Sequence, residues 1–458
     1  MRMIVTLIKK EILEDIYNIR FVILALLCCV LIPMTLFINQ KTLSRDMEDY
    51  YQALAKYEER LTSGQANTLT FEASGFRPPS PLRMFSNGLD SSLPSEIQTT
   101  REEGIKSAST REDDSTHHAL FGNLDLLFIV KVVMSLIAII FTFNAISGEK
   151  EQGTLKLILS NSIPRYKVAV AKYLGNFLIL AIPFSLGLVI GLLIIVFTSG
   201  TQILSEENLP RIFLMFVVAL IYISLFLNLG LFVSVVAKRS WTSIVFLLFA
   251  WVVFVLVVPQ TSGMLADIVY PIKSRRVLNI EKDIQRKNIE TEQSMELRDI
   301  FRKDNYDQLR APIVDKYRQL LGKRLENIEL EYTTKKQMQR TIATSLSRVS
   351  PASSLTFVFS ELSNTGYLEQ ENFTARAREF QDLIDKNVYA GTYSESAGSG
   401  LSVKLGSQDL SNVPRFATQE IQFERSLAVV EPDMFLLLTL NILFFAAGVL
   451  LFTQYDIR

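Results

Sequence analysis

Long runs of apolar residues, separated by polar segments of very different lengths, form the dominant pattern of this chain. A hydrocarbon slab of about 30 Å needs roughly 20 helical residues to cross it. Runs of about that length occur at residues 21–38, 125–146, 173–198, 212–237, 241–259 and 433–454. The pattern therefore predicts an all-α polytopic membrane protein with six transmembrane helices.

The charged residues beside the spans predict their orientation. Twelve cations and six acids gather on one side if both termini, the 147–172 loop and the 238–240 turn lie there. Because lysine and arginine accumulate on the cytoplasmic side of short loops, we expect cytoplasmic termini, including a short tail at 455–458. Residues 39–124 and 260–432 are then two extracytoplasmic domains, and residues 199–211 are a short external loop.

Residues 1–20 carry an apolar stripe at helical spacing, opposite a row of charged residues. Such a stripe beside a span is typical of an amphipathic helix in the headgroup layer of the cytoplasmic face. The alternative is a cytoplasmic extension of the first span. The only two cysteines, Cys28 and Cys29, lie inside that span, so neither external domain can contain a disulfide.

The second external domain is expected to be mainly a helical hairpin. Charged and apolar residues alternate at helical intervals from Val277 to Phe301 and from Ile313 to Leu346, with breaks expected at Asn305 and at Ala311-Pro312. One apolar stripe of the second helix consists of Val314, Tyr317, Leu321, Leu325, Ile328 and Tyr332.

Beyond the hairpin, the apolar stretch Leu355–Leu362 lies between expected turns at Ser350-Pro351 and Thr365-Gly366. We expect it on the membrane surface or as a cap of the hairpin. The first external domain opens with a helical pattern through Asp46–Leu61 and then loses its periodicity.

Motifs for catalysis and nucleotide binding are absent from the sequence. The chain has no G-x-x-x-x-G-K-[ST] loop and no H-E-x-x-H or G-x-S-x-G arrangement. Its only histidines, His117 and His118, are adjacent and have no cysteine partner nearby, so we expect no metal site. The chain is therefore expected to be neither an enzyme nor a cofactor-binding protein, and no nucleic-acid partner is expected.

Three polar residues inside the spans need an explanation, because a polar group in hydrocarbon is costly unless it faces protein or water. Lys131 lies near the outer end of the second span, where its long stem can reach the headgroups. The alternative for Lys131 is a place along a substrate path. Asn228 and Asn441 are more central, and we expect them to form hydrogen bonds between helices.

The loop between the second and third spans contains the most specific motif. Glu149 leads into a Gly-Thr-Leu triplet, a run of aliphatic residues follows, and basic residues precede the next span. This loop resembles the coupling segment of type-2 ABC transporter permeases, which contacts a separate ATPase. The matching residues are Glu149, Gly153, Thr154, Leu155, Leu157, Ile158, Leu159, Arg165 and Lys172. Relatives often have proline at the position of Ser162 and glycine at that of Ala171, so the turn after the segment can differ in shape.

The resemblance implies a half-transporter in the plasma membrane, and a bacterial inner membrane is expected. Its implied partners are cytosolic ABC ATPase subunits, which would bind ATP and Mg²⁺, and a second permease, identical or homologous. Glu149 and Glu151 would dock to the ATPase through a helix over residues 149–159. Leu155, Ile158 and Leu159 would anchor that helix to the bundle. The resemblance favours export, and the large insertion before the last span is similar to permeases associated with multicopper-enzyme maturation.

Three other interpretations remain open at this point. The external domains could relay ATP-driven motion to an external partner protein without moving a solute. The chain could also be an ATP-independent channel or receptor, which would have no stable ATPase partner. For the 147–172 loop alone, the alternative is a generic amphipathic connection between spans. The substrate cannot be deduced from the sequence.

Overall fold

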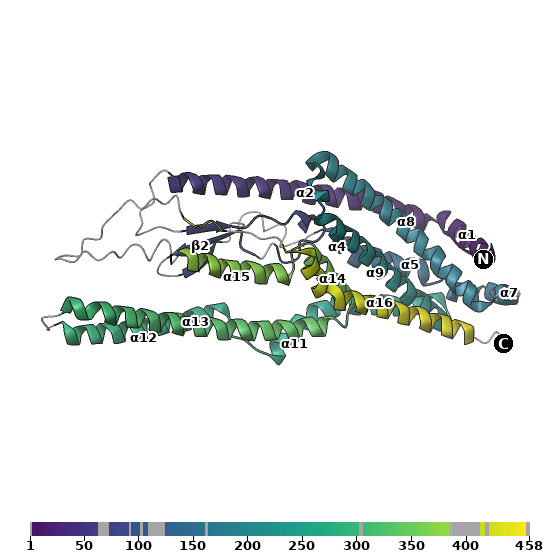
Figure 1. The fold of residues 1–458 in the computed structure, drawn as a ribbon. Coiled ribbons are helices and arrows are strands. Elements are labelled where there is room, and N and C mark those ends of the chain that lie inside the picture. Colours follow the sequence, from purple (N-terminus) through teal and green to yellow (C-terminus); the bar gives the residue numbers. More distant parts are fainter. Residues whose placement is uncertain are drawn as a thin grey trace. The chain divides into compact units, whose positions relative to one another are not determined.

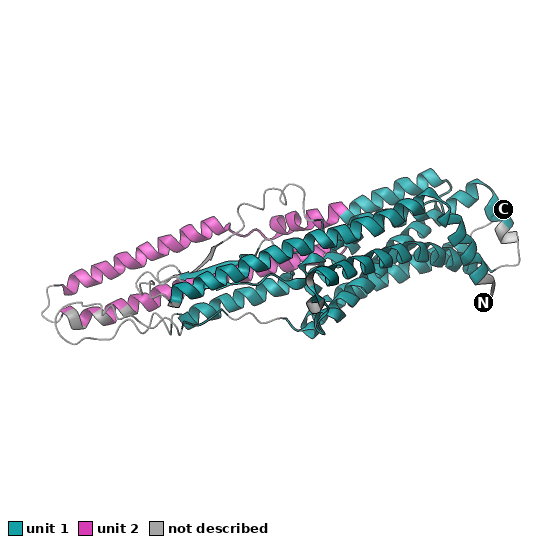
Figure 2. Cartoon of the chain, turned by 90° about the horizontal axis from the view of Figure 1, so that it is seen from above, with its two compact units in different colours: residues 1–255, 351–458 teal, residues 256–350 magenta. Residues whose placement is uncertain are grey.

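The computed structural model describes residues 2–62, 73–90, 93–100, 104–108, 124–160, 164–301, 306–384, 386, 413–416 and 421–454. His117, His118, Ser162 and the tail at 455–458 lie outside the described residues. The chain divides into two compact units (Figure 2). Unit 1 comprises residues 1–255 and 351–458, and unit 2 comprises residues 256–350.

Among the described residues, six helical stretches are long and apolar enough to cross a membrane. They are Ile19–Leu61, Leu126–Glu151, Arg165–Thr198, Asn208–Val236, Ser240–Val269 and Phe423–Gln454. The prediction of an all-α polytopic membrane protein with six spans is therefore confirmed. Several helices extend beyond their apolar runs, because polar residues with good helix propensity add to a helix once it has formed.

The spans are built from helices of different regularity. Helix α2 (Ile19–Thr62) is continuous from the first span through the helical pattern expected at its outer end. The second span combines α4 (Leu126–Phe128), the π-helical η3 (Ile129–Met134) and α5 (Ser135–Thr142). The fifth combines α10 (Ser240–Trp251), the π-helical η5 (Val252–Val257) and α11 (Val258–Val269).

Helix α9 (Asn208–Val236) is the centre of unit 1, where it packs against α5, α8 (Arg165–Ser199), α10 and α16 (Phe423–Gln454). In α9, 67% of the most apolar stretch is buried, whereas the corresponding fraction in α16 is 17%. Helix α16 therefore presents a large apolar face outward. Helix α8 lies very close to α2, since a Cβ added at Gly187 would be 2.4 Å from the Cys28 carbonyl oxygen.

Helix α1 (Arg2–Ile16) packs against α8 and is separated from α2 by a turn at Tyr17 and Asn18. Residues 2–16 are therefore not a straight extension of the first span. Helix α1 and the segment that follows the second span lie at the same end of unit 1 (Figure 1).

The described residues between the first and second spans contain a small antiparallel sheet that the sequence analysis did not predict. Its strands are β1 (Ala73–Phe76), β2 (Glu96–Thr100) and β3 (Gly104–Ala108), in the order β1-β2-β3. Gly75 faces Ile97 across the first pair of strands. Helix α15 (Tyr367–Ile384) covers the sheet with its apolar residues Phe373, Ala377, Phe380 and Ile384.

Helix α14 (Pro351–Leu362) lies in the core of unit 1, where it packs against α16 and α9. Leu355, Val358 and Phe359 are fully buried there. The expectation that this stretch lies on a membrane surface is therefore wrong, because both of its faces are covered by helices. The expected turn after it is present, with Asn364 in the left-handed region at φ 54°.

Unit 2 contains the expected hairpin, formed by α12 (Arg275–Ile300) and α13 (Tyr306–Ser347) packed against each other. The stripe of α13 is correct, since Tyr317 and Tyr332 are buried. The break expected at Ala311-Pro312 is wrong, because α13 runs through Pro312. Proline removes one intrahelical hydrogen bond, and the packing of the stripe offsets that loss.

Candidate functional site

The segment after the second span forms two short helices, α6 (Ser147–Glu151) and α7 (Thr154–Ser160). The single helix expected over residues 149–159 is therefore wrong. Gly153 separates the two helices and adopts φ 71°, a left-handed conformation that side chains with a Cβ rarely adopt. Figure 1 shows α7 at the end of unit 1 where α1 lies. The segment 147–160 is called the coupling segment below.

Leu155 attaches the coupling segment to the helices behind it. Its side chain is 2% exposed and belongs to an apolar cluster that is formed with Ile146, Val168, Ala169, Val235 and Phe452. Leu157 is 69% exposed and makes no such anchor. Ile158 and Leu159 lie in α7, but their side chains are outside the described residues.

Lys172 of α8 connects the coupling segment to helix α1. Its Nζ lies 2.8 Å from Oε1 of Glu149 and 3.1 Å from Oε1 of Glu11. Lys172 is only 3% exposed, so its charge is compensated by two carboxylates rather than by water. The other oxygen of Glu149, Oε2, is buried and has no hydrogen-bond partner among the described residues.

Helix α6 lies against the connection between the fourth and fifth spans. The Nζ of Lys150 donates to the carbonyl oxygens of Val235 and Ala237 at the end of α9. The carboxylate of Glu151 accepts hydrogen bonds from the backbone N–H of Ser240 at 3.2 Å and from its hydroxyl at 2.9 Å. Glu151 therefore caps the first turn of α10.

Two further contacts fix the ends of this region. The hydroxyl oxygen of Ser234 accepts the backbone N–H groups of Ile146 at 3.0 Å and Ser147 at 2.9 Å, where α6 begins. Arg165 donates from Nη1 to the carbonyl oxygen of Thr453 at 2.8 Å, joining the start of α8 to the end of α16. On one side, the coupling segment thus contacts α8, α9, α10 and α16.

The same segment exposes a surface on its other side. Its exposed residues are Glu151, Gln152, Gly153, Lys156 and Leu157, and Thr154 is half-buried with its hydroxyl donating to the Glu149 carbonyl oxygen at 3.4 Å. A short element with one anchored face and one exposed face can transmit a push from a partner to the helices behind it.

Sequence reasoning found Glu149, Glu151, Leu155 and Arg165 but missed several of their partners. Glu11 is 161 residues from Lys172, and Ser240 is 89 residues from Glu151. No local pattern connects such pairs. The one available signal is that Lys172 belongs to the motif itself, so a buried partner for its charge could have been sought.

The acidic end of α1 is electrostatically unusual. Burial, reinforced by the charges of Glu11 and Glu14, raises the pKa of Asp15 to about 6. Lys172 and Arg20 oppose this rise in the pKa but do not cancel it. Helix α1 therefore carries a carboxyl group that titrates near neutral pH.

The polar residues within the spans form a separate network. Asn228 of α9 donates from Nδ2 to Oδ1 of Asn441 in α16 at 2.6 Å, and Asn441 donates to the carbonyl oxygen of Ile221 at 3.0 Å. Ser224 also donates to Oδ1 of Asn441, at 3.3 Å, and lies 2.7 Å from the hydroxyl of Tyr173. The network connects α8, α9 and α16.

Lys131 lies apart from that network, in the π-helical part of the second span. Its charge acts on Asp125, the N-cap of α4, whose carboxylate accepts hydrogen bonds from the backbone N–H groups of Phe128 at 2.8 Å and Asn87 at 3.0 Å. Lys131 therefore interacts with the start of its own span.

Comparison with protein families gives a match over almost the whole chain. The family model described as ABC-2 family transporter protein matches residues 5–457. The match covers both units and includes the coupling segment, Lys172 and Arg165. No curated protein matches the chain.

Proposed function

This chain belongs to the ABC-2 family of transporter proteins, and we propose that its coupling segment is the surface on which the transporter's ATPase acts. The chain is a permease subunit of an ABC transporter and a multi-pass membrane protein, and its partners are cytosolic ABC ATPase subunits. In this proposal ATP and Mg²⁺ bind to the ATPase, and this chain contributes no nucleotide site.

The contacts of the coupling segment carry the proposal. Leu155 and the Glu149–Lys172 ion pair attach it to the membrane helices, while Lys156 and Leu157 are exposed. Movement of the exposed face would therefore move α8, α9 and α16 together. Glu151 is exposed and suited to contact the ATPase, whereas Glu149 acts mainly by holding the segment through Lys172.

Cross-linking tests this assignment. A Lys156→Cys variant carrying a photoactivatable cross-linker should capture the ATPase when the transporter is purified from native membranes. Glu206→Cys is a matched control, because Glu206 is exposed in the turn before α9, between the third and fourth spans. Capture of the ATPase from Glu206 but not from Lys156 would reverse the proposed orientation.

In the proposed orientation, residues 1–20, 147–172, 238–240 and 455–458 are cytoplasmic, and residues 39–124, 199–211 and 260–432 are external. The excess of cations supports it. The contacts Arg165–Thr453 and Glu11–Lys172 add support, since they hold α1, the start of α8 and the end of α16 at one end of unit 1. A plasma membrane, such as a bacterial inner membrane, is the proposed location.

We propose export as the direction of transport and a second permease, identical or homologous, as a partner. The exposed apolar side chains of α10 and α16, among them Phe246, Phe249, Phe435 and Ile442, support a partner within the membrane. The mass of the intact complex in lipid nanodiscs tests this point. A complex with two ATPases and only one permease chain would contradict it.

A second candidate function is the relay of ATP-driven motion to an external partner protein. Arg211 favours it, because this buried residue at the start of α9 donates to Asn364 Oδ1 at 2.9 Å and to Ser426 Oγ at 3.0 Å. The carbonyl oxygen of Thr365 in the same turn accepts the N–H of Leu89 at 2.8 Å. The membrane helices are thereby joined to the external part of unit 1.

ATPase measurements on the purified complex separate the two functions. A relay should respond to an isolated external protein, and Arg211→Met should abolish that response while preserving basal hydrolysis. An exporter should respond to a lipid or a small molecule. A response to solute alone, unchanged by Arg211→Met, would exclude the relay.

A further inference from the structure

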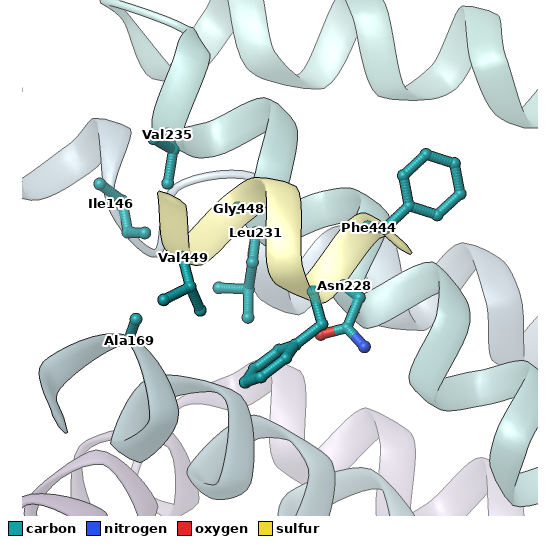
Figure 3. Close-up of a pocket in the computed structure, with 9 residues that line it drawn as sticks. Ile146, Ala169, Asn228, Leu231, Val235, Phe444, Gly448 and Val449 are labelled. Atoms are coloured by element: carbon teal, nitrogen blue, oxygen red, sulfur yellow. The ribbon is translucent and has the colours of Figure 1, made fainter. Parts of the chain in front are cut away.

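The apolar recess between α8, α9 and α16 has almost no free space. Figure 3 shows its walls, among them Leu231 of α9 and Phe444 and Gly448 of α16. The recess has room for about one water molecule, and none of its lining residues carries a charge. A larger ligand needs an exposed surface, and unit 2 has one at the base of its hairpin, where α11, the start of α12 and the second half of α13 meet.

Helix α11 ends the fifth span, and its exposed surface is largely apolar. The residues Ser262 and Ala266 are buried, and α11 packs against α13. Four apolar residues are between 47% and 76% exposed, namely Met264, Leu265, Ile268 and Val269. Tyr270 follows α11 directly, and tyrosine at the end of a span is typical of the boundary between hydrocarbon and headgroups. The exposed side of α11 is therefore suited to contact lipid.

Cations gather immediately after this apolar surface. Residues 264–282 and 329–340 contain seven cations and only four acids. The cations are Lys273, Arg275, Arg276, Lys282, Lys335, Lys336 and Arg340, and the acids are Asp267, Glu281, Glu329 and Glu331.

Side-chain contacts hold these two stretches of the chain together. Gln339 donates from Nε2 to the carbonyl oxygen of Tyr270 at 2.9 Å. The guanidinium group of Arg275 lies over the ring of Tyr332, 5.4 Å from its centroid. The base of the hairpin therefore has a net positive charge next to the end of a span.

Neighbouring carboxylates compensate these cations only in part. Glu329 is shared by two of them, since it lies 3.5 Å from Nη1 of Arg275 and also pairs with Lys282. Lys336 is exposed and forms no ion pair with any described residue. Burial lowers the pKa of Lys336, and the positive charges of Arg275 and Arg340 lower this pKa further, against the opposing charge of Glu329. These three cations therefore lie close enough to repel one another, and an anion between them would relieve that repulsion.

We propose that the base of the hairpin binds an anionic phospholipid, with its phosphate at Arg275, Lys336 and Arg340 and its acyl chains along the exposed residues of α11. A guanidinium group can donate to two phosphate oxygens at once, and an ammonium group adds a further charged contact. Basic residues beside the end of a span are a common binding surface for anionic headgroups. A zwitterionic phospholipid carries a cation of its own, so it gains less from the same surface.

Both parts of the surface favour a lipid over a soluble anion. A free phosphate would use the cations alone and would gain nothing from Ile268 and Val269. Arg275 is only six residues beyond the last residue of the span, and six residues of chain reach at most about 20 Å. The cations therefore lie within reach of the headgroups, whichever side of the membrane the hairpin faces. The site does not depend on the proposed function of the coupling segment.

Photolabelling of the purified full-length chain in phosphatidylcholine nanodiscs tests the proposal. The probe is a phosphatidylglycerol with a diazirine in one acyl chain, and the control probe is a phosphatidylcholine with the same chains. The anionic probe should label α11 about tenfold more strongly than the control probe. Replacing Arg275 and Lys336 together by glutamine should remove most of that difference, because each cation near an anionic headgroup strengthens binding severalfold.

Three further variants separate a lipid site from general effects of charge or folding. Lys323→Gln with Arg324→Gln removes two exposed cations from α13 at positions 12 and 13 residues before Lys336, about 18–20 Å away along the helix. This pair of substitutions should leave labelling unchanged. Lys336→Gln alone breaks no ion pair between described residues, so it should fold normally and still reduce labelling severalfold. Lys336→Arg keeps the charge and should preserve labelling.

Three outcomes would overturn the proposal. Equal labelling of α11 by the two probes would show that the charge of the headgroup plays no part. Full labelling in the Arg275 and Lys336 double variant would show that these cations do not form the site. Loss of labelling in the presence of an equimolar amount of glycerol 3-phosphate, which has the phosphate but no acyl chains, would identify a site for a soluble anion instead of a lipid.

Discussion

The ammonium group of Lys172 and the carboxylate of Glu149 form a buried ion pair, with 2.8 Å between Nζ and Oε1. The pair joins α8 to the coupling segment, and Glu11 of α1 binds the same ammonium group. One cation thus holds together three elements at the end of the bundle where the ATPase is proposed to act.

Replacing Lys172 should lower the stability of the protein far more than neutralising Glu149. Lys172→Met leaves Glu11 and Glu149 as two uncompensated, partly buried carboxylates, and we expect a loss of about 3–5 kcal/mol in stability. Glu149→Gln can still accept a hydrogen bond from Lys172 and should retain the fold while weakening ATPase coupling. Thermal unfolding in detergent and ATPase activity of the complex measure the two effects.

Lys167→Met is the matched control for this prediction. Lys167 lies on the same helix, with its ammonium group over the ring of Tyr166, and forms no ion pair with any described residue. Its replacement should change stability by less than about 1 kcal/mol. Equal losses for Lys167→Met and Lys172→Met would mean that the buried network has no special role.

Gly153 should be replaceable only by residues that tolerate its backbone conformation. A Cβ at this position meets nothing within 4 Å, so any penalty comes from φ 71° and not from crowding. Gly153→Val should cost about 1–2 kcal/mol locally, change the angle between α6 and α7, and reduce ATP-driven transport. Gly153→Asn should stay close to wild type, because asparagine tolerates the left-handed region.

Transport assays in proteoliposomes, together with cross-linking from Lys156→Cys, measure this effect. The fold should survive in both variants, since Gly153 is exposed. Full transport activity in Gly153→Val would show that the bend between α6 and α7 is not needed for coupling.

The spans could be predicted from the sequence because the requirement for apolar residues acts along the chain. The stripe of α13 and the anchoring role of Leu155 could be predicted for a similar reason, because apolar residues recur there at helical spacing. The strands β1, β2 and β3 could not be predicted, because each has only four or five residues. Strands this short are stabilised by α15, which lies far away in the sequence.

The candidate site could likewise be predicted only in part from the sequence. The motif gave Glu149, Gly153 and Arg165, but it did not indicate that Gly153 would divide the expected helix. A glycine after a short polar turn can start a helix or end one, and tertiary contacts decide between them. Here Lys150 and Glu151 hold α6 against α9 and α10, while Leu155 holds α7 in its own cluster.

The contact between α2 and α8 should be intolerant of any side chain at Gly187. Its added Cβ would lie 2.4 Å from the carbonyl oxygen of Cys28, so the helices must move apart. We expect Gly187→Ala to lose about 1–3 kcal/mol, as for other overpacked sites. Gly263→Ala is the control, because a Cβ there meets nothing within 4 Å and alanine favours the helix. A lower unfolding temperature for Gly263→Ala than for Gly187→Ala would contradict the close approach of α2 and α8.

The docking of α1 should depend on pH through Asp15. The pKa of this carboxyl is raised from 3.8 to about 6, so the folded state holds its proton more tightly than the unfolded state does. As pH rises from about 4 to about 6, the unfolded chain gives up the proton first and the stability of the docked helix falls. Above about pH 6 the charged Asp15 faces Glu11 and Glu14, and the loss is complete.

A spin label at Leu13→Cys, an exposed position on α1, reports this change. The label should be more mobile at pH 7 than at pH 5, and Asp15→Asn should remove most of the difference. Mobility that is independent of pH in the wild type, or that still changes with pH in Asp15→Asn, would show that Asp15 does not control the docking of α1.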